Sequence, residues 1–266
     1  MRSCSIIILV LLGLFSCSED VSREISTDYT VEASLLFQFS RVLSESNYLG
    51  NISYQDYFRI NSSEIPGCPT IERSLDSRII VLDYTSSVEC TQENKKTRTG
   101  KIILDFTLSN TINPSWILEF KDYEFDGSKL SGMRQFKALT SNETEASFEN
   151  LRIELPKNLS FQVTGKFNHS VSRSNFRPFA LSTRGMLEGR DPAGRNFSLM
   201  ITEPKEQLFA CYREGWHQTQ TGKESWRVSR GLNTNVTYTT SFQTSTGCNP
   251  LVIATLPDGR NYQLNP

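Results

Sequence analysis

One β-branched stretch decides the fold class: Arg78-Ile79-Ile80-Val81-Leu82-Asp83-Tyr84. Branched aliphatic side chains favour an extended backbone, because they pack well on a pleated surface and lose rotamer freedom in a helix. A second run of the same kind follows a polar loop and reads Gly100-Lys101-Ile102-Ile103-Leu104-Asp105-Phe106. Two such runs joined by a polar loop predict an antiparallel hairpin.

The same pattern continues toward the C-terminus. Strand-like segments at 116–120 and 123–125 lead into Asp126-Gly127, a dipeptide that tolerates the left-handed angles of a tight hairpin turn. Asp191-Pro192-Ala193-Gly194 and Asp258-Gly259 make two further turns between apolar segments. Short strands with turn residues between them predict an all-β fold, either an antiparallel sandwich or an open barrel-like sheet built of hairpins.

The segment before the strands has a helical pattern instead. Its apolar residues recur at spacings near three and four, and they are Val31, Leu35, Leu36, Phe39, Val42 and Leu43. This spacing predicts one short N-terminal helix over 29–45. We expect residues 29–266 to form a mainly β domain. Cys90 and Cys248 each lie between two strand-like runs. This repeated pattern of strand, cysteine turn and strand suggests the hypothesis of two similar β modules, 29–145 and 155–266.

The first residues have the form of a secretory signal. A basic start is followed by an apolar run over 6–15, which is too short for the roughly 20 residues of a membrane-spanning helix. Leu14-Phe15-Ser16-Cys17 resembles the lipobox of bacterial lipoproteins, in which the cysteine thiol carries the lipid. We therefore predict a signal peptide over 1–16, lipidation of Cys17 and a polar tether over 17–28. The alternative is an ordinary signal peptide that happens to contain a cysteine.

Four of the six cysteines remain once Cys4 and Cys17 are assigned to the signal and the lipid. They are Cys68, Cys90, Cys211 and Cys248. An even number in an exported chain predicts disulfides, and four cysteines allow three connectivities. We favour the two local pairs, Cys68–Cys90 and Cys211–Cys248. No cysteines stand two to four residues apart, which disfavours a zinc site, and we predict no metal.

The sequence offers little for catalysis. The chain has two histidines, His169 in an expected loop or strand end and His217 near Cys211. A Cys–His pair is a catalytic option, but a disulfide cysteine beside an exposed loop histidine is the interpretation we favour. No phosphate-binding, dinucleotide-binding or serine-hydrolase motif is present, so we expect neither a cofactor nor enzymatic activity.

Two other groups of side chains merit attention. Four carboxylates gather on one predicted hairpin, and glycosidases need only two; they are Glu119, Asp122, Glu124 and Asp126. A solvated edge explains them equally well. Trp216 and Trp226 are candidate ligand contacts that would stack on sugar rings or anchor a partner, although core packing is the commoner use of large aromatics.

Several of these stretches together resemble uncharacterised envelope lipoproteins of Bacteroidota. That family carries an extended "ITIDFG", a cysteine loop and "RSGKI", which 79–84, Cys90 and 98–103 resemble. Its closing "GCDN…ATVTINGKTY" is similar to Gly247-Cys248-Asn249 and 254–262. The resemblance implies an envelope lipoprotein with an all-β mature domain and implies no activity. Acidic residues after the lipidated cysteine are associated with export to the cell surface in these bacteria, and 18–20 are Ser-Glu-Asp.

These observations lead to one expected function and two alternatives. We expect a lipoprotein anchored in the outer membrane through its lipid, displayed on the cell surface or facing the periplasm, with a non-catalytic binding or structural role. Its partner would be an outer-membrane protein or a glycan. The 28 Lys and Arg against 29 Asp and Glu argue against nucleic acid. The alternatives are a glycan-binding adhesin or carbohydrate-binding protein and, with less support, a glycan-active hydrolase.

Overall fold

The computed structural model describes residues 28–85, 90–92, 96–110, 112, 114–174, 177–231, 233–245 and 247–264. Within these ranges the chain forms four α-helices, α2 (Tyr29–Glu45), α3 (Asn47–Gly50), α4 (Tyr54–Tyr57) and α5 (Phe209–Arg213). The strands are β1 (Thr70–Ser74), β2 (Ile79–Asp83), β3 (Arg98–Asp105), β4 (Ser115–Phe125), β5 (Ser128–Ala138), β6 (Glu143–Leu155), β7 (Leu159–Ser174), β8 (Arg177–Arg190), β9 (Asn196–Leu208), β10 (Thr221–Ser229), β11 (Asn235–Gln243), β12 (Leu251–Thr255) and β13 (Asn261–Gln263).

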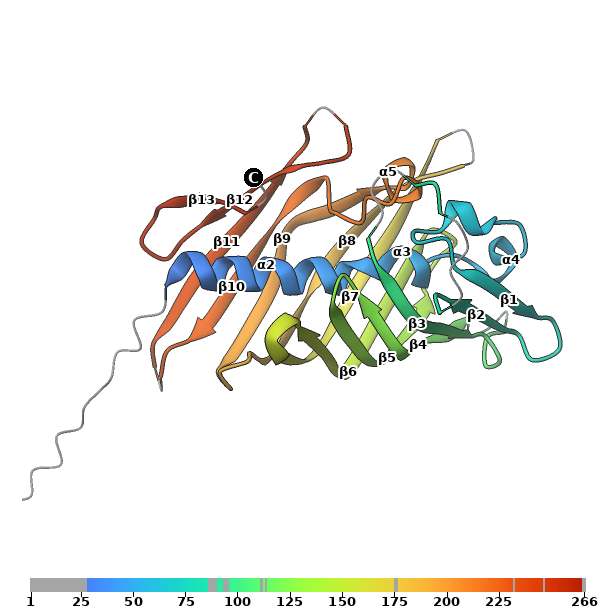
Figure 1. Ribbon diagram of the computed structural model, residues 1–266, viewed down its shortest axis with the longest axis horizontal. Coiled ribbons are helices and arrows are strands. Elements are labelled where there is room, and N and C mark those ends of the chain that lie inside the picture. The colour runs from blue at the N-terminus through green and yellow to red at the C-terminus, as the bar shows by residue number, and fades with distance from the viewer. Residues whose placement is uncertain are drawn as a thin grey trace, which may run out of the picture.

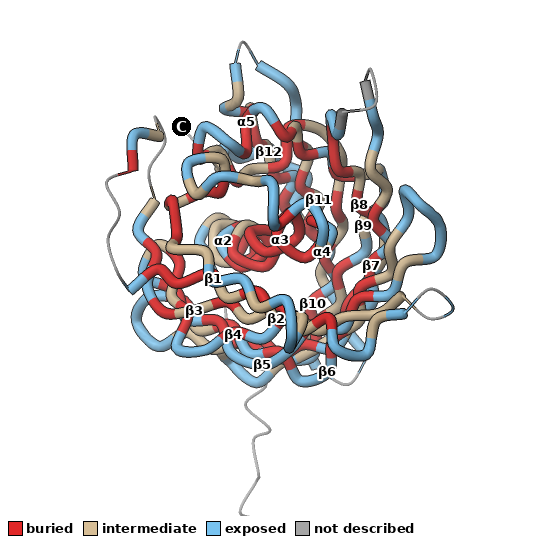
Figure 2. Tube along the Cα trace, turned by 90° about the vertical axis from the view of Figure 1, so that its right-hand side faces the viewer, coloured by how far each residue is buried: buried red, intermediate tan, exposed pale blue. Residues whose placement is uncertain are grey.

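The described strands form one open sheet in which each strand pairs with its neighbours in sequence, from β1 to β13. Every pairing is antiparallel. The sheet curls around α2, which lies along its inside (Figures 1 and 2). The prediction of an all-β fold with hairpins in an open sheet is confirmed, and so is the helix over 29–45.

A side-chain cap stabilises the first turn of α2, and packing against the sheet holds the helix in place. The carboxylate of Asp28 accepts a hydrogen bond from the backbone nitrogen of Thr30 at 2.9 Å, which satisfies one free N–H of the first turn. Phe39 is fully buried and its ring packs against those of Phe161, Phe197 and Trp226. Because the sheet curls around the helix, polar residues such as Glu32, Ser40 and Glu45 are buried along with apolar ones.

Buried polar and ionic interactions connect α2 to the sheet and its connecting segments at three positions along the helix. Near its start, Glu32 binds Arg195 and Arg230. In the middle, Ser40 donates to Glu224, which also pairs with Lys205 at 2.8 Å. In its last turn, Glu45 pairs with Arg98. All three carboxylates are buried, so each needs its cationic partner to offset the loss of hydration.

The predicted turns form as their residues require. Asp126 and Gly127 have φ of 51° and 75°, and they join β4 to β5. The turns at 191–194 and 258–259 join β8 to β9 and β12 to β13. The hairpin of the two β-branched runs is β2–β3, with Ile80 opposite Leu104. The boundary between the two hypothetical modules, at residues 145–155, lies within β6 in the middle of the sheet. Strand pairing continues across it.

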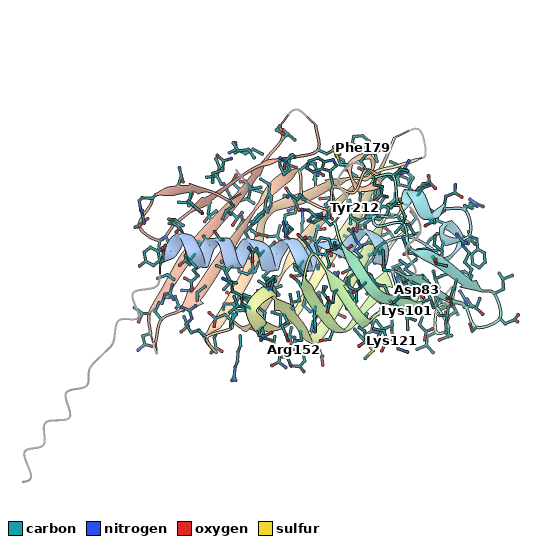
Figure 3. All side chains as sticks on the ribbon, in the orientation of Figure 1. Asp83, Lys101, Lys121, Arg152, Phe179 and Tyr212 are labelled. Carbon is teal, nitrogen blue, oxygen red and sulfur yellow. A yellow bond between two sulfur atoms is a disulfide. The ribbon has the colours of Figure 1, made fainter. Side chains whose placement is uncertain are left out.

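Asp83, Lys101 and Lys121 lie on the outer face of β2, β3 and β4 (Figure 3). Lys101 stands opposite Lys121 in the register, and its ammonium lies 2.7 Å from the carboxylate of Asp83. The hydrogen bond from Lys101 lowers the pKa of Asp83 to about 2. The two like charges on neighbouring strands are thus partly balanced by the carboxylate of the next strand.

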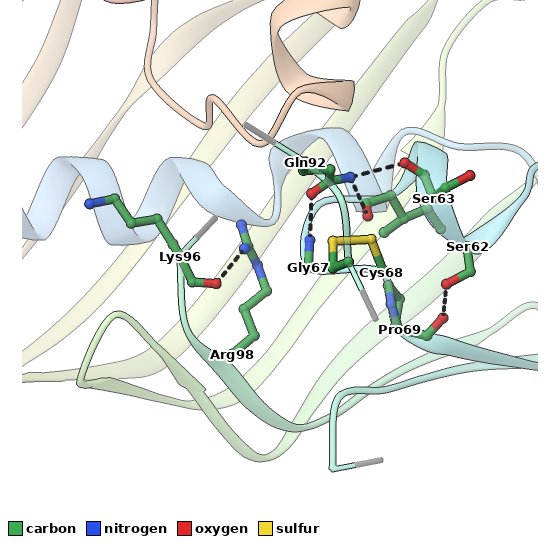
Figure 4. Close-up of a disulfide and its surroundings, with 10 residues drawn as sticks. Ser62, Ser63, Gly67, Cys68, Pro69, Gln92, Lys96 and Arg98 are labelled. Carbon is green, nitrogen blue, oxygen red and sulfur yellow. Dashed lines mark hydrogen bonds between the residues drawn. A yellow bond between two sulfur atoms is a disulfide. The ribbon is translucent and has the colours of Figure 1, made fainter. Parts of the chain in front are cut away.

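Both predicted disulfides are confirmed. Cys68 is joined to Cys90 and Cys211 to Cys248, so the connectivity is the local one. Around the first bridge, the Gln92 side chain accepts a hydrogen bond from the backbone of Gly67 and donates to the carbonyls of Ser63 and Ile65 (Figure 4). The second bridge ties α5 to the loop before β12.

Candidate ligand-binding site

A cavity of about 590 Å³ opens at the end of the sheet where α2 ends. Its lining comes from α3, α4, α5 and the ends of β4 to β8. Five aromatic residues contribute, Tyr48, Tyr54, Phe106, Trp116 and Phe209. Four arginines also line it, Arg59, Arg78, Arg173 and Arg213. An apolar wall beside several cations is a form that ligand sites often take.

The aromatic residues of the lining pack against other rings, so they do not form an open flat surface on which a ligand could stack. Trp116 lies between Phe106 and Phe136, with stacked rings at centroid distances of 5.6 and 5.8 Å. Its indole nitrogen donates to the carbonyl of Gly50 at 2.9 Å. Tyr54 packs against Phe106 at 5.4 Å and carries the guanidinium of Arg78 over its ring. Neighbouring rings and the Arg78 guanidinium thus occupy part of the surface of Trp116 and Tyr54.

The arginines lie on separate elements and are held in different ways. Arg78 donates to the carbonyl of Ser109 at 2.6 Å, and Arg173 to the side-chain oxygen of Asn142 at 3.0 Å. Burial raises the pKa of Tyr48 to about 12, and Arg213 lies within hydrogen-bonding reach of its hydroxyl. Within the described ranges, Arg59, Arg78 and Arg213 form no ion pair with a carboxylate. Their positive charges therefore remain available to a ligand.

Two carboxylates on the cavity wall accept hydrogen bonds from the N-cap residues of short helices. Asp56 accepts a hydrogen bond from the hydroxyl of Ser53 at 2.7 Å, at the start of α4. Glu64 accepts from the backbone nitrogen of Asn61 at 2.9 Å, which closes a capping box. These hydrogen bonds explain how short helices hold together at the cavity mouth.

The two tryptophans that the sequence offers as ligand contacts lie outside this cavity. Trp226 is fully buried in the core, where its indole nitrogen donates to Glu224 at 3.2 Å. The hypothesis that Trp226 contacts a ligand is wrong, because its ring is enclosed by Phe39 and Phe197. Trp216 is half-buried beyond α5, and it does not line the cavity.

The structure corrects both histidine predictions. His169 lies within β7 rather than in a loop or at a strand end, and His217, in the loop after α5, is buried rather than exposed. Burial lowers the pKa of His169 to about 3, and Nδ1 lies 2.9 Å from the hydroxyl of Thr183. Burial also lowers the pKa of His217 well below its usual value. Cys211 is held in a disulfide, so it forms no Cys–His nucleophile pair.

The four hairpin carboxylates also lie outside the cavity. Asp126 pairs with Arg41 of α2 at 2.8 Å, and Glu124 lies 3.5 Å from Lys129. Glu119 and Asp122 are exposed. In the part of the chain that the structure describes, no three His, Cys, Asp or Glu side chains gather as a metal site would require. The described helices include none that is both long and apolar enough to span a membrane.

Sequence reasoning missed the arginines of the cavity. Arg59 follows α4, Arg78 precedes β2, and Arg213 ends α5, so they are far apart in the chain. No local motif marks them, because the curled sheet alone brings these segments to one end. Cys17 and all of the predicted tether over 17–28 except Asp28 lie outside the described residues, and their assignment stays a prediction.

No protein-family model, curated protein or solved structure matches this chain. The site is therefore interpreted from its own geometry.

Proposed function

We propose that this protein is a lipid-anchored lipoprotein of the outer membrane, displayed on the cell surface, that binds a ligand without catalysis in the cavity at the end of its sheet. The lipobox-like residues before Cys17 support the anchor. The cavity of about 590 Å³, with its aromatic wall and arginines, carries the binding role. A volume of roughly 300–1,000 Å³ is typical of small-molecule sites.

The chemistry of the wall supports binding over catalysis. A hydrolase would need an acid, a base or a nucleophile aimed into the cavity. Neither histidine lines it, and its two carboxylates, Asp56 and Glu64, accept hydrogen bonds from the N-cap residues Ser53 and Asn61. The hairpin pair Glu124 and Asp126, which a glycosidase hypothesis would use, is engaged by Lys129 and Arg41.

Glycan recognition is a weaker candidate for this cavity. Protein sites bind sugars by placing a flat aromatic face against the ring, whereas Trp116 already stacks with two phenylalanines, Phe106 and Phe136. Trp226 is enclosed in the core. The cavity wall thus suits an apolar body better than a sugar ring.

The anchor is tested on Cys17. Mass spectrometry of the protein from bacterial membranes is expected to find a lipid on an N-terminal Cys17, and Cys17→Ala is expected to move the protein to the soluble fraction. Cys4→Ala, a change inside the predicted signal, is the matched control and is expected to stay with the membrane. A mature chain that begins elsewhere without lipid would refute the anchor.

The binding role is tested by filling the cavity. Thr144 lies on the cavity wall and is half-buried, so Thr144→Trp is expected to fill part of the space. Native mass spectrometry of the protein purified from its host envelope should detect a bound small molecule that Thr144→Trp loses. Thr237→Trp, at an exposed position of β11, is the control and should retain it. A wild-type protein with no bound molecule, or one equally occupied in both variants, would contradict the proposal.

A further inference from the structure

We infer that the ligand of the cavity is an amphiphilic anion, a molecule with a carboxylate or phosphate head group and an extended apolar tail. This inference rests on the proposed binding function and adds the chemical class of the ligand. The head group would meet the arginines at the mouth, and the tail would lie along the aromatic wall.

The charge of the cavity favours an acidic head group. Arg59 and Arg213 are exposed and Arg78 is half-buried, and all three line the space from different elements. Arg98 and Arg195, which contact α2, are instead paired with its carboxylates Glu45 and Glu32. Arg59, Arg78 and Arg213 form no ion pair with a carboxylate within the described ranges. Asp56 and Glu64 are the two carboxylates of the lining. Guanidinium groups bind carboxylate and phosphate oxygens in pairs, which suits an anion entering between them.

The orientation of Arg78 shows how the head-group region meets the apolar wall. Its guanidinium lies 5.4 Å from the ring centre of Tyr54 while one nitrogen donates to the carbonyl of Ser109. A planar guanidinium has five N–H donors, so these contacts leave donors for a ligand oxygen. A cation is thus fixed at the edge of the apolar surface, where the junction of head and tail would lie.

The apolar wall favours a chain over a flat ring. Ile52, Phe106 and Phe209 are buried residues of the lining, and Trp116 is wedged between two phenyl rings. A ligand that meets such an apolar surface gains by burying methylene groups, at roughly 0.8 kcal/mol for each. An acyl chain, which bends to follow such a wall, fits this surface better than a rigid aromatic or sugar.

The test compares one acid with its own neutral ester. Parinaric acid, a fluorescent polyunsaturated fatty acid, and its methyl ester share the same tail and differ only in the charge of the head group. We expect the full chain to bind the acid at least roughly tenfold more tightly than the ester, the fold-change of one lost charge-assisted hydrogen bond. The change Thr144→Trp should remove binding of both probes.

The arginines are tested in pairs with a matched control. Arg59→Ala/Arg213→Ala should weaken binding of parinaric acid by roughly tenfold or more and leave binding of the ester unchanged. Arg184→Ala/Arg227→Ala removes two exposed arginines of β8 and β10 that do not line the cavity, and it should change neither. Circular dichroism and the melting temperature confirm that both double variants fold.

Competition experiments identify the source of the acidic head. Palmitate and lysophosphatidate should both displace parinaric acid, while neutral monopalmitoylglycerol should compete at least roughly tenfold more weakly, as the ester does. The acid with the higher affinity identifies the head group. Equal affinity for acid and ester, both lost in Thr144→Trp, would overturn the anionic ligand and leave the binding cavity in place. Binding only to phosphatidylglycerol vesicles, and not to the monomeric acid, would overturn the inference in favour of a membrane contact.

Discussion

The carboxylate of Glu45, in the last turn of α2, accepts a hydrogen bond from the Nε of Arg98 in β3 at 2.9 Å, and both side chains are buried. The hydroxyl of Tyr212 in α5 donates to the backbone carbonyl of the same glutamate, beside the end of α2 (Figure 3). An acidic residue at a helix C-terminus is unfavourable, because the carbonyl end carries partial negative charge. Arg98 and Tyr212 offset this, and they fix the helix end that borders the cavity.

Removal of Arg98 is expected to be strongly destabilising. Arg98→Met leaves the Glu45 carboxylate buried without its partner, which typically costs about 3–5 kcal/mol of unfolding free energy. Arg98→Met/Glu45→Gln should recover part of that loss, because no uncompensated charge remains. Urea unfolding followed by circular dichroism measures both.

The control for this pair is an exposed one. Lys223 and Glu203 lie 3.1 Å apart with side chains 39% and 61% exposed, so Lys223→Met should cost under about 1 kcal/mol. Similar losses in Lys223→Met and Arg98→Met would show that burial does not govern the Glu45–Arg98 interaction.

Each disulfide is expected to stabilise the protein by restricting the conformations of the unfolded chain. The bridges span 22 and 37 residues, and the loop-closure model gives about 3–4 kcal/mol for each. Replacing either pair of cysteines by serine should lower the urea midpoint to a similar extent. Peptide mapping of the oxidised wild-type protein should recover Cys68 linked to Cys90 and Cys211 linked to Cys248, and crossed peptides would contradict the connectivity.

The stability of the protein is expected to fall below neutral pH because of buried histidine. The folded pKa of His169 is about 3, while the unfolded value is near 6.5. The folded form binds fewer protons, so this contribution is present above pH 6.5 and is lost as the pH falls toward 3. At pH 5 the loss from His169 is about 2 kcal/mol relative to pH 7.

His169→Gln tests this assignment, because glutamine does not titrate and keeps a polar group near Thr183. The difference in unfolding free energy between pH 7 and pH 5 should shrink by about 2 kcal/mol in the variant. Asp83, with its pKa lowered to about 2, stays ionised over this range and does not contribute. An unchanged pH dependence would assign the acid sensitivity to other groups, of which His217 is the first.

Gly50 is expected to be required because the neighbouring Phe136 ring leaves no room for a side chain there, and not because its backbone needs a conformation that only glycine adopts. An added Cβ would lie 2.1 Å from the Cζ of Phe136, the ring that stacks on Trp116. Gly50→Ala should therefore displace that ring, destabilise the protein by about 1–3 kcal/mol and shift the tryptophan fluorescence. Adding Phe136→Leu should relieve the clash, so the double variant should lose less than the sum of the single losses.

Much of the fold follows from local sequence patterns. The β-branched runs at 79–83 and 101–105 form paired strands, and Asp126-Gly127 turns where left-handed angles are needed. The helix over 29–45 has the bounds that its apolar spacing predicts. The Cys68–Cys90 and Cys211–Cys248 pairs are those that chain proximity favours. All of these depend on residues close in sequence, whose preferences survive in the folded chain.

The buried polar residues were not predictable in this way. Ser40 and Glu45 of α2 interact with residues 184 and 53 positions away, and no spacing in the sequence connects them. Their burial follows from the sheet closing around the helix on nearly every side, whereas helical periodicity assigns polar positions to solvent. The same reason places Trp226 and both histidines in the interior.

The sequence by itself determined the β2–β3 hairpin, the Asp-Gly turns, the helix and the disulfides, because each depends on neighbouring residues or on chain proximity. It also supplies Cys17 and its lipobox-like context, which the described residues do not include. Only the tertiary structure decided the site. Arg59, Arg78 and Arg213 come together because the curl of the sheet places the ends of distant strands around one cavity. The positive charge of the site comes from arginines of several distant segments, and no single segment of the chain contains them all.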